Sequence, residues 1–525
     1  MVLHRLPLMI AIAVTYVLVE TYIASAKPVS PLSPQTLVLT GSARHQLGTP
    51  TKCESTILDA STVGTFADCA RFAPPDKTVR AGFLTWLVND PSPAKLIHGN
   101  PIRIKGAFVK DPLYLDGVDL SSGVFLIGSS LNTLIINRSQ LRGGLVINGS
   151  TVNNLIMSGT TMPQLIVSNS RLKQLSLMDN TFKRLSLFSY SPSPVNFPNH
   201  TEVDNLYLNW SAFDSVLVYG GTVIRCLTAE SSTTLADFLL LDSHITIADF
   251  NEARIGGQLN VSGSQFIAVP GSCPSSSVDS NRWHLNLADA SVGKLIFDSR
   301  TLWPAKNGVN REGFHYSAVG GEFRDLQNGL KWLALEPERP PVDRTVYDRL
   351  ASVYDDSGRP VDAASVKVAK YEAIRKYETL TRLHRAIGTV LYLTIGYGYL
   401  PFRALLFMAI FAVVGMVFFY LTYLAGCIVP TDKDALEYFK QPGRKPPPNY
   451  RPFNALLYSV ETLFPFIDFR QSDSWFPNPI GSRRWLAAVA RTYLWFHMSS
   501  GWLIATLFLI SLTPDGPARF NGLWQ

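Results

Sequence analysis

Residues 145–187 carry an apolar side chain at every fifth position, and no other feature of the sequence restricts the fold as strongly. These positions are Ile147, Val152, Met157, Met162, Val167, Leu172, Leu177, Phe182 and Leu187. Two residues before each lies a second series in which a large apolar residue alternates with a small polar one: Leu145, Ser150, Leu155, Thr160, Leu165, Ser170, Leu175, Asn180 and Leu185. The true period is therefore ten, built from two fives.

A period of five matches neither the 3.6-residue stripe of an α-helix nor the two-residue alternation of a strand. It matches a solenoid that turns a corner every five residues and closes a four-sided coil in about 20 residues, with stacked coils pairing like strands about 4.8 Å apart. The large and small residues alternate because bulky side chains at every corner would overpack a narrow interior. We therefore predict an all-β four-sided β-helix.

This β-helix is expected to cover residues 81–340, with about ten coils in residues 101–300. Serine, proline and asparagine interrupt the pattern at residues 189–200 and again at residues 270–281. Such breaks correspond to loops that leave one side of a solenoid, where binding sites tend to lie. We expect specificity in these two loops rather than in the regular coils.

The count in fives resembles the pentapeptide-repeat proteins, and the resemblance covers about 200 residues. It implies a right-handed four-sided β-helix and implies nothing about activity. Members of that family that imitate DNA have a strongly acidic surface, whereas this stretch places basic residues between its apolar positions: Arg138, Arg142, Arg171, Lys173, Lys183 and Arg184. DNA mimicry is therefore not expected, nor is a nucleic-acid partner.

The N-terminal residues have the order of a secretory signal. Arg5 precedes an apolar run at residues 6–19, and Ala24-Ser25-Ala26 forms an A-x-A cleavage site, so residues 1–26 are predicted to be a signal peptide. Residues 27–80 are interpreted as an irregular lead-in and cap. Export permits disulfides, and the expected pairs are Cys53 with Cys69 and Cys226 with Cys273, leaving Cys427 as a thiol.

From residue 341 the period becomes helical. Two predicted helices within residues 341–385 resemble a tetratricopeptide-type hairpin, although Lys367 and Lys370 occupy positions that are usually apolar or small. We interpret the hairpin as a helical collar. Residues 386–400 are apolar but too short to cross a bilayer, so we expect an interfacial helix there.

Residues 401–427 and 485–512 are long and apolar enough to be transmembrane helices. The loop between them, residues 428–484, is rich in lysine and arginine, whereas the tail at 513–525 has only Arg519. The positive-inside rule then places the loop in the cytoplasm and the β-helix and C-terminus outside. Basic residues from Lys370 to Arg385 oppose this orientation, because they would lie on the outer side.

The same region supports a second interpretation. Residues 453–466 form an apolar helix between two spans and resemble the pore helix of two-span ion channels, with Tyr458, Ser459 and Thr462 in matching order. A pore loop of that kind would reverse the orientation. Potassium selectivity needs backbone carbonyls held by a glycine-rich sequence, and residues 465–469 contain no glycine. Gly396-Tyr397-Gly398-Tyr399 resembles part of the potassium-filter signature in sequence. It lies before the first span rather than between two spans, so it is not expected to form a filter.

The order of hairpin, basic helix, residues 396–405 and two spans resembles a bacterial family of membrane-associated β-helix proteins, some of whose members are described as oxidoreductases. The sequence contains no G-x-G-x-x-G dinucleotide fingerprint, no C-x-x-C and no haem-attachment motif. The residues therefore give no support for an oxidoreductase, and no cofactor is expected.

Two groups of residues are candidates for a functional site. Ionisable groups at membrane depth are costly and usually functional, and here they are Glu461, Asp468, Arg491 and His497. Titratable residues also lie close together in the β-helix: Asp237, Asp242, His244, Asp249 and Glu252. Paired carboxylates among them could cleave glycans by acid/base chemistry. No histidine or cysteine spacing indicates a metal site.

We therefore expect a non-enzymatic scaffold or binding protein, anchored in the cytoplasmic (inner) membrane with its β-helix on the outer, periplasmic side. Its expected partners are the lipid bilayer and a protein or glycan on the β-helix surface. A channel-like or transport component that uses the two spans is the first alternative. An envelope enzyme acting on glycans is the second.

Overall fold

A computed structural model describes residues 48–90, 99–189, 200–267, 273, 283–304, 308–335, 341–441, 443, 446–464, 466–478 and 484–513. The chain divides into two compact units, Met1–Pro337 and Glu338–Gln525. The first contains a parallel β-solenoid of about nine turns, close to the expected ten. The predicted signal peptide, both predicted specificity loops apart from their margins and Cys273, and the tail from residue 514 lie outside the described residues.

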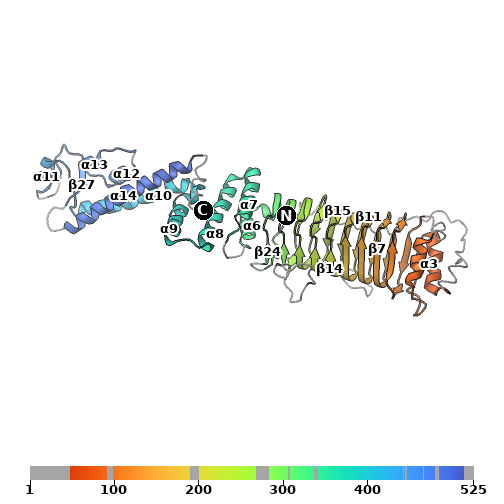
Figure 1. Cartoon of the computed structure of the whole chain (residues 1–525). Helices are drawn as coiled ribbons and strands as arrows, with labels where there is room; N and C mark the ends of the chain where they lie inside the picture. Colours follow the sequence, from red (N-terminus) through yellow and green to blue (C-terminus); the bar gives the residue numbers. More distant parts are fainter. Residues whose placement is uncertain are drawn as a thin grey trace. The chain divides into compact units, whose positions relative to one another are not determined.

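The solenoid strands fall into two parallel sheets, and successive strands of each sheet form the rungs in Figure 1. Sheet A contains β1 (Phe66–Asp68), β2 (Ile102–Lys105), β5 (Asp119–Leu120), β6 (Val124–Ile127), β8 (Gln140–Leu141), β9 (Leu145–Asn148), β11 (Thr161–Ser168), β13 (Thr181–Phe188), β15 (Ala212–Tyr219), β17 (Thr233–Thr234), β18 (Phe238–Leu240), β20 (Arg254–Asn260), β23 (Ser291–Phe297) and β25 (His315–Gly321). Sheet B contains β3 (Phe108–Val109), β4 (Leu113–Asp116), β7 (Ser130–Asn137), β10 (Thr151–Ser158), β12 (Arg171–Met178), β14 (Glu202–Tyr207), β16 (Val223–Thr228), β19 (His244–Asp249), β21 (Gln265–Phe266), β22 (Leu285–Asn286) and β24 (Val309–Asn310).

The register of the regular turns follows the sequence period. Leu155 pairs with Leu175 in sheet B, and Leu165 pairs with Leu185 in sheet A, so one turn takes 20 residues there. Every member of the two five-residue series between 145 and 187 is buried, with at most 3% of its surface exposed. Pairing skips the third residue of each long strand, for example Asn153. Each long strand therefore consists of two short paired pieces.

The small polar members of the second series hydrogen-bond inside the solenoid. The Ser150 amide donates to Ser170 Oγ at 3.1 Å, and the Ser150 hydroxyl donates to Asn148 O and Leu126 O. The Thr160 amide likewise donates to Asn180 Oδ1 at 2.8 Å. These side chains thus provide partners for buried backbone groups at the strand ends, where the ladder of the sheet stops.

A residue with positive φ precedes each of these small side chains. Gly149 precedes Ser150 with φ 58°, and Asn169 precedes Ser170 with φ 47°. Glycine and asparagine tolerate this left-handed conformation better than most residues. The ten-residue period therefore marks backbone corners as well as inward side chains.

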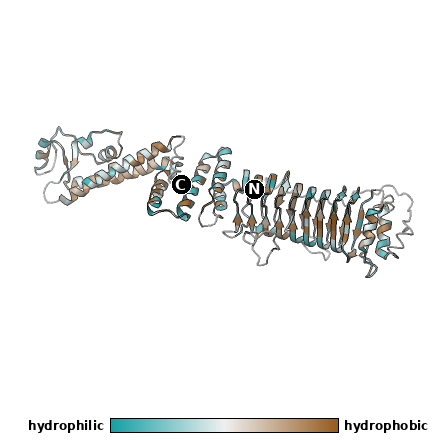
Figure 2. Ribbon diagram, viewed as in Figure 1, coloured by the Kyte–Doolittle hydropathy of each residue, from teal (hydrophilic) through white to brown (hydrophobic). Residues whose placement is uncertain are grey.

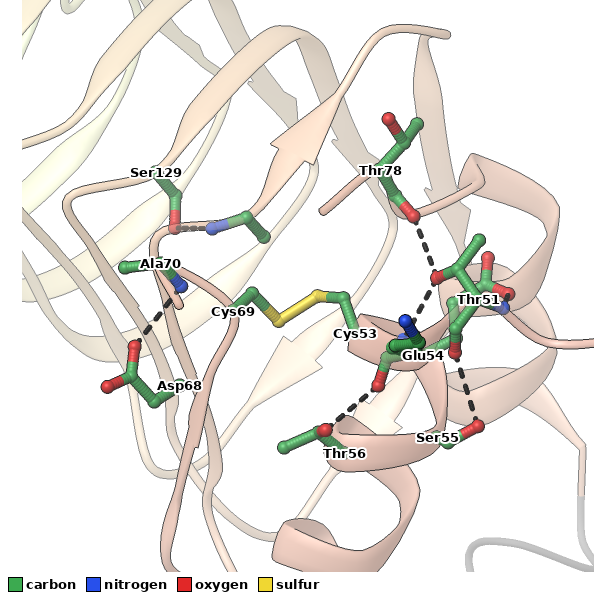
Figure 3. The surroundings of a disulfide bond; sticks show 12 residues. Thr51, Cys53, Glu54, Ser55, Thr56, Asp68, Cys69, Ala70, Thr78 and Ser129 are labelled. Atoms are coloured by element: carbon green, nitrogen blue, oxygen red, sulfur yellow. Dashed lines mark hydrogen bonds between the residues drawn. A yellow bond between two sulfur atoms is a disulfide. The ribbon is translucent and has the colours of Figure 1, made fainter. Parts of the chain in front are cut away.

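Helices α3 (Lys52–Val63) and α4 (Ala81–Asn89) accompany the first strands of the solenoid. The Cys53–Cys69 disulfide joins α3 to the segment that follows β1 (Figure 3). Glu54 is fully buried and accepts hydrogen bonds from the backbone amide and the guanidinium of Arg80. Residues 27–80 were expected to be irregular, but α3 and β1 within that range are regular and are held by a disulfide and by the ion pair of the buried Glu54 with Arg80. Residues 81–89, expected to belong to the β-helix, instead form α4.

Aromatic residues fill the last turns. Phe297 packs against Phe323 of η1 (Glu322–Arg324), and Trp303 packs against Trp332 of α6 (Leu326–Leu333). The buried Arg311 donates to Trp332 O at 2.5 Å. This aromatic layer covers interior side chains of the final turns, as a solenoid end requires.

The second unit begins with the predicted hairpin, α7 (Arg344–Asp356) and α8 (Pro360–Tyr377). The two lysines at unusual positions have partners on α7: Lys367 contacts Asp355 at 3.0 Å and Lys370 contacts Asp348 at 2.6 Å. The carboxylates of α7 therefore explain how the second helix accommodates lysine in place of small or apolar residues.

Residues 386–400, expected to form an interfacial helix, contain most of α9 (Arg382–Ile395) and all of η2 (Gly396–Gly398). Gly396, Tyr397 and Gly398 all have positive φ, and the Tyr397 hydroxyl donates to Glu372 Oε1 at 2.5 Å. The Gly-Tyr-Gly sequence therefore forms the tight connection from α9 to α10 (Phe402–Leu424), rather than a lining of backbone carbonyls.

Within the described residues, two helices are long and apolar enough to cross a membrane by length and composition, α10 and α14 (Arg484–Ser511). Figure 2 shows both mostly in apolar colours. Between them lie β26 (Ile428–Pro430), α11 (Lys433–Phe439), α12 (Ala455–Leu463), α13 (Gln471–Ser474) and β27 (Trp475–Pro477). β26 and β27 pair antiparallel, and the fully buried Trp475 packs against Tyr423, Phe439 and Phe453. The described residues between α10 and α14 are thus largely folded rather than an open loop.

Candidate functional site

Helix α12 lies in close contact with both apolar helices, and two glycines permit this approach. A Cβ on Gly415 of α10 would lie 2.3 Å from Ser459 Oγ, and a Cβ on Gly501 of α14 would lie 1.9 Å from Leu463 O. Alanine at position 415 would displace the side chains of Ser459 and His497, and alanine at position 501 would require the backbone of α12 to shift at Leu463. The predicted pore-type helix, expected at residues 453–466, is the shorter helix α12 (Ala455–Leu463), and it packs against α10 and α14.

His497 lies at this three-helix contact and is fully buried. Its Nε2 is 3.1 Å from Ser459 O and 3.3 Å from Ser459 Oγ, and the Ser459 hydroxyl donates to Ala412 O at 2.8 Å. Nδ1 of His497 has no hydrogen-bond partner among the described residues. His497 and Ser459 thus link α14, α12 and α10, and the geometry favours a packing role.

Glu461 is also buried, but its carboxylate faces α13 rather than His497. It accepts hydrogen bonds from the Gln471 amide at 2.7 Å and from the amide and hydroxyl of Ser472 at 3.1 and 2.5 Å. Donors therefore surround the carboxylate, which fixes the chain that follows α12. Glu461 therefore connects the end of α12 to the start of α13 by hydrogen bonds.

The other two membrane-depth candidates are peripheral. Asp468 is exposed and accepts a hydrogen bond from the Arg470 amide at 2.8 Å. Arg491 donates to Pro477 O at 3.2 Å, and its guanidinium lies 5.4 Å from the centre of the Phe476 ring. Glu461, Asp468, Arg491 and His497 therefore do not form one constellation.

The acidic candidates of the solenoid also separate. Asp237 accepts hydrogen bonds from the amide and side chain of Gln258, and Asp242 contacts Arg300 at 2.7 Å. His244 is exposed at the start of β19. Asp237 and Asp242 are therefore paired with residues other than Asp249, and His244 is exposed to solvent.

Asp249 and Glu252 have a third neighbour that sequence inspection missed, Glu230. Burial raises the pKa of Glu230, and the charges of Asp249 and Glu252 raise it further. Burial likewise raises the pKa of Asp249, although hydrogen bonds from Asn251 and Asn286 oppose that effect. One turn of the solenoid takes 21 residues here, so Glu230 lies opposite Asn251 on the next turn. Counting one turn forward from Glu230 in the sequence would therefore have indicated that Asp249 and Glu252 are nearby.

A shallow polar groove lies beside these carboxylates. Its lining residues are Ser231, Thr233, Glu252, Arg254 and Asp289. The Ser231 hydroxyl donates to Glu252 Oε2 at 2.9 Å. The groove offers carboxylate, guanidinium and hydroxyl groups on adjacent turns, which is a surface suited to polar ligands.

The disulfides join Cys53 to Cys69 and Cys226 to Cys273. The second attaches Cys273, from the predicted loop at residues 270–281, to β16 on the outside of sheet B. Cys427 is a buried thiol that follows α10. Within the described ranges, no group of three histidine, cysteine, aspartate or glutamate side chains could hold a metal ion.

The basic residues that opposed the predicted orientation differ in their surroundings. Lys370 is paired with Asp348, and Arg375 contacts Glu372 at 2.7 Å. Arg382 and Arg385 are exposed on α9. Part of this cluster is therefore neutralised by neighbouring carboxylates.

No known protein family, no curated protein and no solved structure matches this chain.

Proposed function

We propose that this protein is a membrane-anchored β-solenoid that presents a rigid surface for binding or assembly outside the cytoplasmic membrane. The observation that carries the proposal is the contrast between its two units. The solenoid buries most of its apolar residues in its interior and exposes only scattered ones, such as Trp210 and Leu235, whereas α10 and α14 expose large apolar side chains along their length, including Leu406, Val413 and Trp502. Such a face in a soluble protein would be an aggregation liability, and lipid covers it in a membrane protein.

The cross-section of the solenoid can also be inferred from its strands. We infer four-sided pentapeptide-type coils, because each long strand has two paired pieces with a gap at its third residue. The spacing of inward residues supports this: Val152 and Leu155 are three apart, whereas Leu155 and Met157 are two apart, so the chain bends between Val152 and Leu155.

The proposed orientation has the solenoid and the C-terminus outside and the segment between the spans in the cytoplasm. Basic residues between the spans support it, and the partial neutralisation of Lys370 and Arg375 reduces the local charge that opposed it. A secretory signal at residues 1–26 would direct the solenoid across the membrane. Disulfides are typical of that compartment.

The experiment is a topology measurement in cells. A reporter that is active only outside the cytoplasm is fused after Gln525, and a second fusion is placed after residue 440 between the spans. We expect activity from the first and none from the second, with the protein in the membrane fraction. The reverse pattern would overturn the orientation, and recovery in the soluble fraction would overturn the anchor.

A channel-like function is the second candidate, favoured by the seating of α12 between two apolar helices. Reconstituted protein that conducts ions would support it, particularly if replacement of Asp468 alters the conductance. Asp468 makes the better test than Glu461, because loss of the buried Glu461 contacts would disturb folding.

A further inference from the structure

Four successive turns of the solenoid carry an outward side chain at the same backbone corner, between a strand of sheet B and the next strand of sheet A. We call these residues the corner row, and they are Trp210, Ser231, Glu252 and Asp289. The strand register places them side by side on successive turns. At about 4.8 Å per turn, the row is about 14 Å long.

The corner row has an unusual backbone conformation for its side chains. All four residues have positive φ, from 50° at Ser231 to 57° at Glu252. In the same register, glycine occupies this corner in the turn after the row, at Gly313, and two turns before it, at Gly159. The left-handed conformation is unfavourable for a side chain as large as tryptophan, so its presence at Trp210 indicates a use for the outward indole.

Three residues of the corner row line the polar groove described above. Ser231, Glu252 and Asp289 share its lining with Thr233 and Arg254, which are partners in the strand register. The groove has a volume of about 430 Å³, within the range of pockets that bind small ligands. Trp210 continues the row by one turn beyond Ser231, and 57% of its surface is exposed.

Charged groups of the groove are available to a ligand. Other arginines of the solenoid pair with carboxylates: Arg138 with Asp116, Arg142 with Asp119 and Arg300 with Asp242. By contrast, the side chains of Arg254 and Asp289 have no hydrogen bond or ion pair within the part of the chain that the structure describes. A donor and an acceptor without internal partners therefore lie on adjacent turns of one groove.

This combination suits a hydroxyl-rich ligand of low charge. The carboxylates, the guanidinium and the hydroxyls of the groove can accept from and donate to sugar hydroxyls. The exposed indole of Trp210 offers a flat apolar surface for the C–H face of a pyranose ring. Glu252 and Asp289 outnumber Arg254, and Glu230 and Asp249 lie nearby, so the local potential opposes an acidic polymer.

A peptide would fit this surface less well. Strand β17 beside the groove pairs with β15 on one side and with β20 on the other, so it offers no free edge to which an extended peptide could add. The groove lining contains no apolar side chain that would hold an apolar anchor of a protein partner.

We propose that the corner row and its groove bind a neutral glycan chain that runs along the solenoid axis, with one sugar ring against Trp210. The proposal rests on the proposed function, which has the solenoid outside the cytoplasm, where polymeric glycans occur. The turn spacing of about 4.8 Å is similar to the length of one pyranose unit in an extended chain. Successive sugar rings can therefore meet successive turns.

Calorimetric titration of the full chain in detergent tests the proposal. The neutral probes are cellohexaose, chitohexaose, xylohexaose and mannohexaose, and hexagalacturonate is the anionic probe. We expect at least one neutral hexasaccharide to bind and hexagalacturonate not to bind. Trp210→Ala should weaken that binding by about tenfold, the loss typical of a binding anchor, whereas Trp210→Phe should retain most of it.

The matched control for the aromatic platform is Tyr114→Ala. Tyr114 is 58% exposed, almost as much as Trp210, and it lies on β4, several turns from the groove. Its loss should leave binding unchanged. Unaltered thermal unfolding of Trp210→Ala, which removes an exposed side chain, shows that the solenoid is intact.

The polar groups are tested by Asp289→Asn and Arg254→Gln. Each removes a charge without a bulky change, and asparagine tolerates the positive φ of Asp289. Both should weaken binding of the neutral hexasaccharide severalfold. Asp111→Asn, at an exposed carboxylate away from the groove, should have no effect.

The glycan site fails if none of the four neutral hexasaccharides binds, if hexagalacturonate binds more tightly, or if Tyr114→Ala weakens binding as much as Trp210→Ala. None of these results bears on the membrane anchor or its orientation, which the fusions after Gln525 and residue 440 measure separately. Recovery of the chain in the soluble fraction would overturn the proposed function even if the purified protein bound a hexasaccharide.

Discussion

The backbone amide of Ser150 donates a hydrogen bond to the hydroxyl oxygen of Ser170 one turn later, at 3.1 Å. Both side chains are buried, and the Ser170 hydroxyl in turn donates to Ser168 O at 2.6 Å. The small polar residues of the ten-residue period therefore serve as hydrogen-bond partners inside the solenoid, in addition to limiting its volume.

Replacement of Ser170 by alanine is expected to destabilise the solenoid. It leaves the buried Ser150 amide without its acceptor, and an unsatisfied buried donor costs about 1–3 kcal/mol. The free energy of unfolding, measured by denaturant titration in detergent, should fall by that amount. Thr161→Ala is the control, because Thr161 is exposed on β11, and a similar loss there would contradict the role of burial.

Glu202 and Asp249 are expected to affect the pH dependence of stability in opposite directions. Burial acts to raise the pKa of Glu202, but the hydrogen bonds and charges of Arg171 and Arg225 outweigh it, so the pKa lies below its usual value. This contribution to stability is present above about pH 4.5 and disappears as pH falls through the pKa of the folded state. Glu202→Gln should therefore lower the unfolding temperature at pH 7, with the difference shrinking on acidification.

The charge of Asp249 is expected to have the opposite effect on stability at pH 7. Its pKa is raised in the folded state, chiefly by burial, so the ionised carboxylate opposes folding at pH 7. Asp249→Asn should leave the unfolding temperature at pH 7 unchanged or higher, with any gain vanishing as pH falls below the range in which Asp249 ionises. A clear loss of stability at pH 7 would show that the hydrogen bonds from Asn251 and Asn286 need the charge.

The Cys53–Cys69 disulfide is expected to hold the N-terminal cap in place. The two cysteines are 16 residues apart, a loop for which removal of the crosslink costs about 3 kcal/mol in the chain-entropy estimate. Cys53→Ser with Cys69→Ser should increase proteolysis within α3 before the rest of the solenoid is cleaved. Simultaneous cleavage throughout the solenoid would instead show that the cap and the turns unfold as one.

Gly501 is expected to be intolerant of any side chain. A Cβ there would lie 1.9 Å from Leu463 O, a backbone atom that can move only with α12. Gly501→Ala should lower the stability of the second unit by about 1–3 kcal/mol, the usual penalty for overpacking. Ser500→Ala is the adjacent control on the same helix, and an equal effect there would indicate a general weakness of α14.

The period of the sequence determined much of the solenoid. Spacing alone identified the inward residues from Leu145 to Leu187, because a residue that faces the interior in every turn must recur at the length of a side. The approximate bounds of α10 and α14 could also be predicted, because each coincides with a long apolar run in the sequence.

Only the tertiary structure decided which polar groups meet. Asp237 and Asp242 are near Asp249 in sequence but have other partners, whereas Glu230 lies one turn before Asn251, so its carboxylate is influenced by the charges of Asp249 and Glu252. Glu461 and His497 both seemed to be membrane-depth candidates from hydropathy, yet Glu461 faces α13 and His497 faces Ser459. His497 and Gly501 lie on the face of α14 that packs against Ser459 and Leu463 of α12. Periodicity determines what lies inside a repeating structure, whereas contacts between separate elements depend on register and packing that no local pattern encodes.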